Sequence, residues 1–206
     1  MPDIESLRMI SQSLALLDAI LSPEWEDRYY SFNSKWSKGE MMASMRNGTG
    51  DEYFILFNAA GAIIKGFAHE SVMSPYAKES GRVWQGVLDD VPNEFDSFLI
   101  EPAFSIDDTT FCIWRRYRDS SWQVGTIDYP EGENSDGSAD LLFIFDGNAS
   151  TYKEFAEEYY DAEINLGSVE HIYQHQPLTS RIVASLNENV TIEELKEDII
   201  EIGYPL

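Results

Sequence analysis

The most distinctive chemical feature of the sequence is an acidic segment. No lysine or arginine occurs between Asp119 and Tyr152, whereas carboxylates accumulate there, so the local potential is negative. Positions 129–140 are rich in turn-forming residues and show no apolar period, which predicts an exposed surface loop. The carboxylates that could contact a partner are Asp128, Glu131, Glu133, Asp136 and Asp140.

Two roles for this loop are compatible with its sequence. It could attract a basic protein, because complementary charge raises the rate of association. Alternatively, it is a solvated loop that only keeps a sheet edge from aggregating. Under the first hypothesis, neutralising Glu131, Glu133, Asp136 and Asp140 together slows association and flattens its salt dependence.

Part of the acidic segment has the spacing of a calcium-binding loop. Asn134, Asp136 and Gly137 fit the third, fifth and sixth positions of the twelve-residue pattern. The first and twelfth positions are Gly132 and Phe143, however, so two essential oxygen ligands are absent. We therefore predict no calcium site of this type.

Two histidines have the spacing of a pair of zinc ligands on one helical face. These are His171 and His175, but Tyr173 and Pro177 favour an extended segment, in which that face would be lost. Neither a third nearby histidine nor a cysteine pair completes a ligand set. We expect no metal site.

The chain carries no familiar catalytic or cofactor-binding motif. It lacks a nucleophile elbow, a phosphate-binding glycine loop, a dinucleotide fingerprint and the metalloprotease helix. We expect a non-catalytic protein without a cofactor. The alternative is an enzyme of unrecognised family with a cleft near residues 69–90, where the candidate pocket residues are His69, Glu70, Tyr76 and Trp84.

A second cluster combines basic and aromatic residues, in the stretch Trp114-Arg-Arg-Tyr-Arg118 followed by Trp122. Such clusters can bind phosphates or stacked bases. We favour a structural role, because the surplus carboxylates of this chain offer ion-pair partners and the aromatic rings offer cation–π contacts.

Hydrophobic periodicity predicts the elements that must position these residues. Residues 69–90 have no such period and predict a long connection, anchored in the core by Trp84. Helices are expected over 3–21, 92–99, 151–160, 178–186 and from 191 to Gly203, and strands over 28–36, 40–46, 53–57, 62–67, 111–117, 121–127, 141–145 and 169–174. The pattern predicts a single α+β domain over residues 1–206, with a mostly antiparallel sheet and helices at the N-terminus, middle and C-terminus.

Composition limits the classes of partner. The chain has 206 residues, 37 of them acidic and 14 basic, for a formal net charge of −23. This charge repels nucleic acid and anionic lipid surfaces, so we expect a basic protein partner. The single cysteine, Cys112, cannot form an internal disulfide, and no apolar stretch approaches the length of a bilayer span. We expect a cytoplasmic protein.

One stretch resembles a known family. Trp84 and the later run Val91-Pro-Asn-Glu-Phe-Asp-Ser-Phe-Leu99 are similar to the tryptophan and the following helix of the SUKH superfamily of bacterial toxin-immunity proteins. The chain departs from that family after Leu99, where Ile100-Glu-Pro102 replaces an asparagine-glycine turn. The resemblance implies an α+β fold and a non-catalytic role in neutralising a toxin by binding it. A third possibility is an oligomeric subunit whose interface includes the aromatic residues of 29–36.

Overall fold

The computed structural model describes residues 1–79 and 81–205, and these form two compact units. Unit 1 comprises Met1–Lys38 and Ile144–Leu206, and unit 2 comprises Gly39–Phe143. Helices and antiparallel strands are both present, so the α+β class is confirmed. The single-domain assignment stays a prediction.

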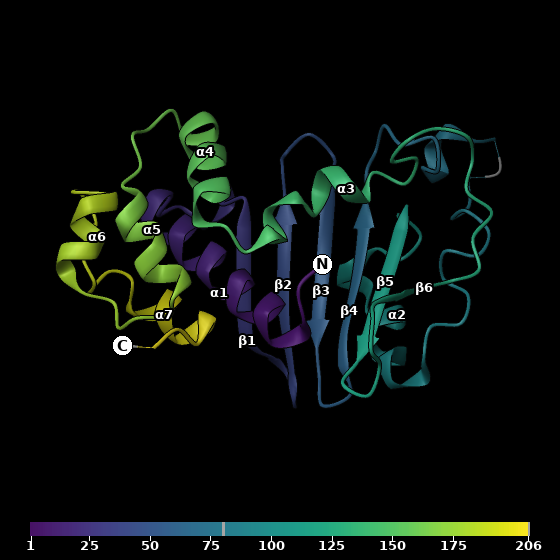
Figure 1. Ribbon diagram of the computed structural model, residues 1–206, viewed down its shortest axis with the longest axis horizontal. Coiled ribbons are helices and arrows are strands. Elements are labelled where there is room, and N and C mark those ends of the chain that lie inside the picture. Colours follow the sequence, from purple (N-terminus) through teal and green to yellow (C-terminus); the bar gives the residue numbers. More distant parts are fainter. Residues whose placement is uncertain (80, 206) are drawn as a thin grey trace. The chain divides into compact units, whose positions relative to one another are not determined.

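Unit 2 contains five antiparallel strands that follow one another in sequence order. They are β2 (Glu40–Arg46), β3 (Glu52–Phe57), β4 (Gly61–Phe67), β5 (Phe111–Arg116) and β6 (Gln123–Val124). Continuous apolar runs favour the buried strands β3 and β4, and short turns join β2 to β3 and β3 to β4, whereas a long connection separates β4 from β5. Figure 1 shows β2 to β5 side by side.

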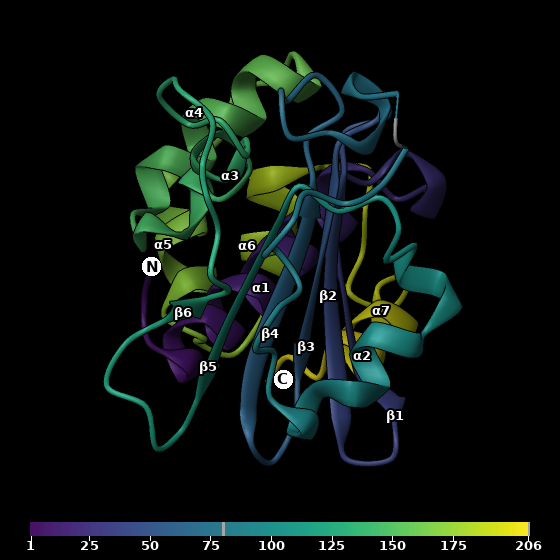
Figure 2. The ribbon, with the colours of Figure 1, turned by 90° about the vertical axis from the view of Figure 1, so that its right-hand side faces the viewer.

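Short helices occupy the connections of unit 2. They are the 3₁₀ helices η2 (Pro75–Ala77), η3 (Asn93–Phe95) and η4 (Pro102–Phe104) and the α-helices α2 (Asp96–Ile100) and α3 (Ser138–Leu141). Figure 2 shows α2 beside the strands. The buried ring of Phe104 packs between helix α2 and strand β3. Its centroid lies 4.7 Å from that of Phe98 on α2 and 5.0 Å from that of Phe54 on β3.

A buried cation lies within the sheet of unit 2. The side chain of Lys65 on β4 has no exposed surface, and its Nζ lies 3.0 Å from Oε1 of Glu52 on β3. Burial lowers the pKa of Lys65, although the neighbouring Glu52 carboxylate opposes this effect. The ion pair therefore keeps a charge inside the sheet that would otherwise be costly.

Unit 1 is built around its first helix. It comprises α1 (Ile4–Leu21), the 3₁₀ helix η1 (Trp25–Asp27), β1 (Tyr30–Ser37), α4 (Ala149–Tyr160), α5 (Leu166–Tyr173), α6 (Ser180–Leu186) and α7 (Lys196–Ile202). The 3₁₀ helix η5 (Phe143–Asp146) leads into it. Asp3 caps α1 by accepting a hydrogen bond from the backbone of Ser6, and α1 packs against β1, α5 and α7.

Asp18 of α1 is fully buried and connects three elements of unit 1. Its Oδ2 accepts hydrogen bonds from the backbone N–H groups of Tyr29 and Tyr30 at the start of β1, and its Oδ1 accepts one from the Tyr152 hydroxyl on α4. Burial raises the pKa of Asp18 to about 6, even though these hydrogen bonds act in the opposite direction. The structure therefore holds a carboxyl group that titrates far from its usual range.

Two predicted strands are wrong. Residues 141–145 belong to α3, η5 and the turn between them, and residues 169–174 lie mostly in α5. A short continuous apolar run does not distinguish a buried strand from a buried helix, so local caps decide. Asn165 accepts a hydrogen bond from the backbone of Ser168 and begins α5 as its N-cap.

Other predictions were correct in part. The hairpin of residues 53–57 and 62–67 is confirmed, whereas the strand predicted over 121–127 is reduced to β6. Trp84 is not a core anchor: it is partly exposed, and the apolar residues Met73 and Val87 of that connection are fully buried instead. Among the described residues, no helix is long and apolar enough to cross a membrane.

Candidate functional site

A cleft in unit 2 brings together residues from both of the sites predicted separately. Its volume is about 370 Å³. One wall is formed by residues 68–72, which come directly after β4 in the chain, and by Asp51, which directly precedes β3. The other wall is part of the acidic segment. The lining residues are Asp51, Ala68, His69, Glu70, Ser71, Val72, Glu131, Gly132, Glu133, Asn134, Ser135, Gly137, Asp140 and Leu141.

Asp51 holds the ring of His69 in a defined position. The Nδ1 atom of His69 lies 2.7 Å from Oδ1 of Asp51, and the backbone N–H of His69 donates to the same oxygen at 2.8 Å. Gly50 makes room for the ring, because a Cβ at this position would lie 3.3 Å from Cγ of His69. The other ring nitrogen, Nε2, lies 3.8 Å from Oε1 of Glu70.

Asp51 is ionised at neutral pH. Its partial burial raises the pKa, but the hydrogen bonds from His69 and from the Asn47 side chain outweigh this effect and lower the pKa below its usual value. Because an ionised carboxylate only accepts hydrogen bonds, Nδ1 of His69 must carry a proton. In neutral His69, Nε2 is therefore the unprotonated nitrogen.

The acidic segment packs against the wall formed by residues 68–72. Ser71 donates its hydroxyl to the backbone oxygen of Ser135 at 2.7 Å. Gly137 adopts a left-handed conformation with φ of 77°, and a Cβ there would lie 2.3 Å from that of Ala68. A glycine at this point thus allows the segment to approach the residues that follow β4.

The cleft carries a concentrated negative charge. Five of its fourteen lining residues are Asp or Glu, and none is lysine or arginine. Among the described residues, Glu131, Glu133 and Asp140 have no ion-pair or hydrogen-bond partner through their carboxylates. Their charge is therefore not cancelled by the protein itself.

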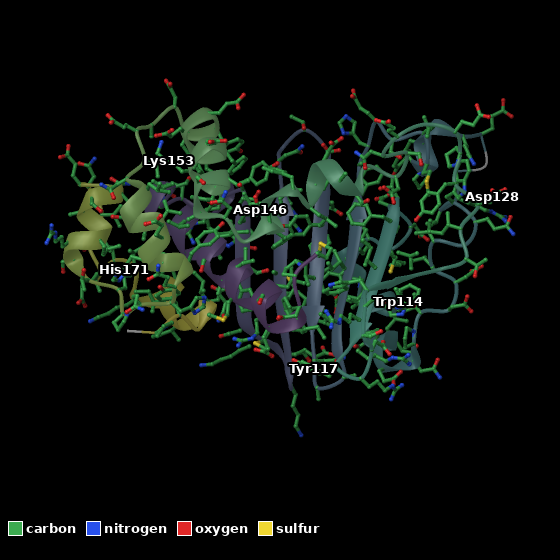
Figure 3. All side chains as sticks on the ribbon, viewed as in Figure 1. Trp114, Tyr117, Asp128, Asp146, Lys153 and His171 are labelled. Atoms are coloured by element: carbon green, nitrogen blue, oxygen red, sulfur yellow. The ribbon has the colours of Figure 1, made fainter. Side chains whose placement is uncertain are left out.

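Only some of the predicted partner-binding residues line the cleft. Glu131, Glu133 and Asp140 line the cleft, whereas Asp128 and Asp136 do not. Asp136 is nearly buried and accepts a hydrogen bond from the backbone of Ser138. Asp128 directly precedes the loop of residues 129–140 and is labelled in Figure 3.

Only two of the four predicted pocket residues line this cleft. His69 and Glu70 line the cleft, whereas Tyr76 and Trp84 lie outside it. Tyr76 is exposed and donates its hydroxyl to Asp108 at 2.7 Å. Trp84 donates its indole N–H to the backbone oxygen of Asp128, while Lys78 lies over its ring. These contacts tie both aromatic residues to other parts of unit 2, and their role in a pocket stays a prediction.

Asp51 is the cleft residue that sequence reasoning missed. Asp51 follows the turn Asn47-Gly-Thr-Gly50 and looks like an ordinary turn aspartate. Its role depends on a contact with a histidine 18 positions later in the chain. The antiparallel pairing of Glu52 with Phe67 brings the two segments together, so a correct strand register would have been the only available signal.

The residues with metal-ligand spacing make other contacts in the structure. In residues 1–79 and 81–205, no group of three or more His, Cys, Asp or Glu side chains is arranged to hold a metal ion. Asn134 accepts a hydrogen bond from the backbone of Ala139, so its side chain is used within the loop. His171 lies on helix α5 (Figure 3), contrary to the expected extended segment, and its Nε2 lies 3.0 Å from the backbone oxygen of Pro177. His175 contacts the backbone oxygen of Met9 instead.

The arginines of the cluster Trp114–Arg118 bind acidic residues and a backbone oxygen of the same chain. Arg116 pairs with Asp119 at 2.9 Å, and Arg118 pairs with Glu94 at 2.8 Å. Arg115 donates to the backbone oxygen of Asp119. The structural role expected for these arginines is thus supported by their contacts.

A second cavity occurs in unit 1 and differs in character. It measures about 450 Å³ and is lined by residues of α1, of α5 and of the turn before α4. Met9, Ile10 and Tyr173 supply apolar surface, and Glu170 is its single charged residue. The high charge density of the cleft in unit 2 makes that cleft the stronger candidate for a functional site.

Comparison with known proteins adds no relative: no family model, no curated protein and no solved structure matches this chain.

Proposed function

We propose that this protein is a non-catalytic binding protein that uses the acidic cleft of unit 2 to hold a basic protein partner. The observation that supports this proposal is the cleft with five carboxylates and no lysine or arginine in its lining. An immunity protein that neutralises a basic toxin is the specific form of this proposal, in keeping with the resemblance to the SUKH superfamily.

The physical argument rests on unpaired charge. Glu131, Glu133 and Asp140 contribute negative potential that a lysine or arginine of a partner would neutralise. Such a potential also accelerates encounter and repels nucleic acid and anionic lipid. The lining residue Val72 is 54% exposed and offers apolar contact beside the charges, a combination that suits a protein surface.

A peptide-binding experiment tests the proposal. The affinity of a fluorescent hexa-arginine peptide would be measured by anisotropy for the intact chain and for the variant Glu70→Gln, Glu131→Gln, Glu133→Gln and Asp140→Asn. Four exposed ion pairs at about 0.5 kcal/mol each amount to about 2 kcal/mol, or roughly a 30-fold rise in Kd. The salt dependence of binding should also become flatter.

A matched control separates the cleft from overall charge. The variant Glu24→Gln, Glu26→Gln, Glu158→Gln and Glu188→Gln removes the same number of exposed carboxylates from unit 1. Its Kd should rise much less than that of the cleft variant. Equal losses in the two variants would show that only net charge attracts the peptide and would refute the cleft as the binding site.

The alternative function, an enzyme, is favoured by one observation, the Asp51–His69 pair at the cleft. A carboxylate that orients a histidine is a common arrangement in general acid–base catalysis. The surrounding carboxylates would destabilise a developing oxyanion, so the compatible reactions are those whose transition state gains positive charge, such as glycoside hydrolysis. Hydrolysis of chromogenic glycosides by the intact chain, lost in His69→Gln, would support this alternative, and no turnover across a panel would count against it.

A further inference from the structure

We propose that His69 is a proton-operated switch for the acidic cleft: neutral His69 permits a basic partner to bind, and protonated His69 weakens that binding. This inference rests on the proposed function, because it concerns the regulation of the same cleft. Histidine is suited to such a role, since its charge changes between about pH 5 and 8.

The position of the ring is the first support for the switch. Asp51 holds Nδ1 through a 2.7 Å hydrogen bond, so only Nε2 gains a proton when His69 becomes charged. This nitrogen lies 3.8 Å from the Glu70 carboxylate, whose side chain is 89% exposed and free to turn toward it. Protonation therefore adds a positive charge inside the cleft and gives Glu70 an internal partner.

The groups around His69 give the second support. The titratable groups that share the cleft with it are Asp51 and Glu70 beside the ring and Glu131, Glu133 and Asp140 on the facing segment. All of these are acidic, and no lysine or arginine lines the cleft within the described residues. A protonated His69 is thus the only cation that the lining itself can supply, and it competes with the cation of a partner for the same carboxylates.

The switch predicts that the affinity for a basic peptide decreases as the pH falls. A hexa-arginine peptide keeps its full charge between pH 5.5 and 7.5, so a change in Kd over this range reports on the protein. We expect the Kd of the intact chain to be about tenfold higher at pH 5.5 than at pH 7.5. In His69→Gln the ratio of the two values should fall to about 1 or 2, whatever the affinity at pH 7.5.

A histidine outside the cleft provides the control. His171→Gln changes a histidine of α5 in unit 1 and should keep the tenfold ratio of the intact chain. A second measurement does not depend on any variant: isothermal calorimetry at pH 6 in buffers of different ionisation enthalpy should show that peptide binding releases protons.

The possible outcomes separate the two proposals. A tenfold ratio that persists in His69→Gln would overturn the switch and leave the binding function intact, since other groups would then cause the pH dependence. An equal Kd at both pH values in the intact chain, or binding without proton release, would overturn the switch as well. Failure of the peptide to bind at pH 7.5 would overturn the proposed function and the switch together.

Discussion

Replacement of Asp18 by asparagine should remove one defined contribution to the pH dependence of stability. Asp18 is fully buried in unit 1, and burial raises its pKa from 3.8 to about 6. In the unfolded chain the carboxyl group is exposed to water and titrates near its usual value. The folded state therefore binds the proton of Asp18 more tightly than the unfolded state does.

The sign and size of the effect follow from this difference. The stabilisation linked to protonation is fully present below about pH 3.8 and is lost as the pH rises through about 6. A shift of about two pKa units corresponds to about 3 kcal/mol of unfolding free energy. Asparagine has nearly the same shape and keeps an acceptor for the N–H groups of Tyr29 and Tyr30, but it does not titrate.

Urea unfolding of the intact chain and of Asp18→Asn between pH 4 and pH 7.5 measures this effect directly. The difference in unfolding free energy, intact chain minus variant, should fall by about 2.5 kcal/mol over this range, because part of the roughly 3 kcal/mol is already lost at pH 4. Other titrating groups cancel in the difference, including Asp51 and Glu194, whose lowered pKa values give the opposite trend. The exposed Asp27→Asn serves as the control. A difference that stays constant with pH would refute the assignment of this dependence to Asp18.

Substitutions at Glu52 in unit 2 and at Asn165 in unit 1 test one polar contact of each unit by urea unfolding. Glu52→Gln should destabilise the chain by about 2–3 kcal/mol, because it leaves the buried ammonium of Lys65 without its counter-charge; an unchanged midpoint would show that Lys65 is neutral or finds another partner. Asn165→Ala should cost about 1 kcal/mol through the loss of the α5 N-cap, and Asn165→Asp should retain most of the stability. Equal losses in the two Asn165 variants would contradict the capping role.

Local sequence patterns were sufficient for elements whose signal lies within a few residues. The hairpin of β3 and β4 combines two apolar runs with a tight turn, and α1 combines an N-cap with a helical apolar stripe. The run Leu141–Phe145 lacked such a signal, because an apolar run of this length is equally compatible with a buried strand and a buried helix. Gly137 and the residues before it begin a short helix there instead.

At the candidate site, too, the sequence determined some properties and the tertiary structure determined others. The sequence alone determined the negative charge, the absence of familiar catalytic motifs, and the separate candidacy of Glu131, Glu133 and Asp140 on one segment and His69 and Glu70 on another. These properties depend on residue type and local spacing.

Only the tertiary structure decided that these two sets of residues line one cleft and that Asp51 orients His69. Strand pairing and the docking of the acidic segment bring together residues that are distant in the chain. Sequence periodicity carries no information about such distances, because it reports which face of an element is apolar and not which element that face meets.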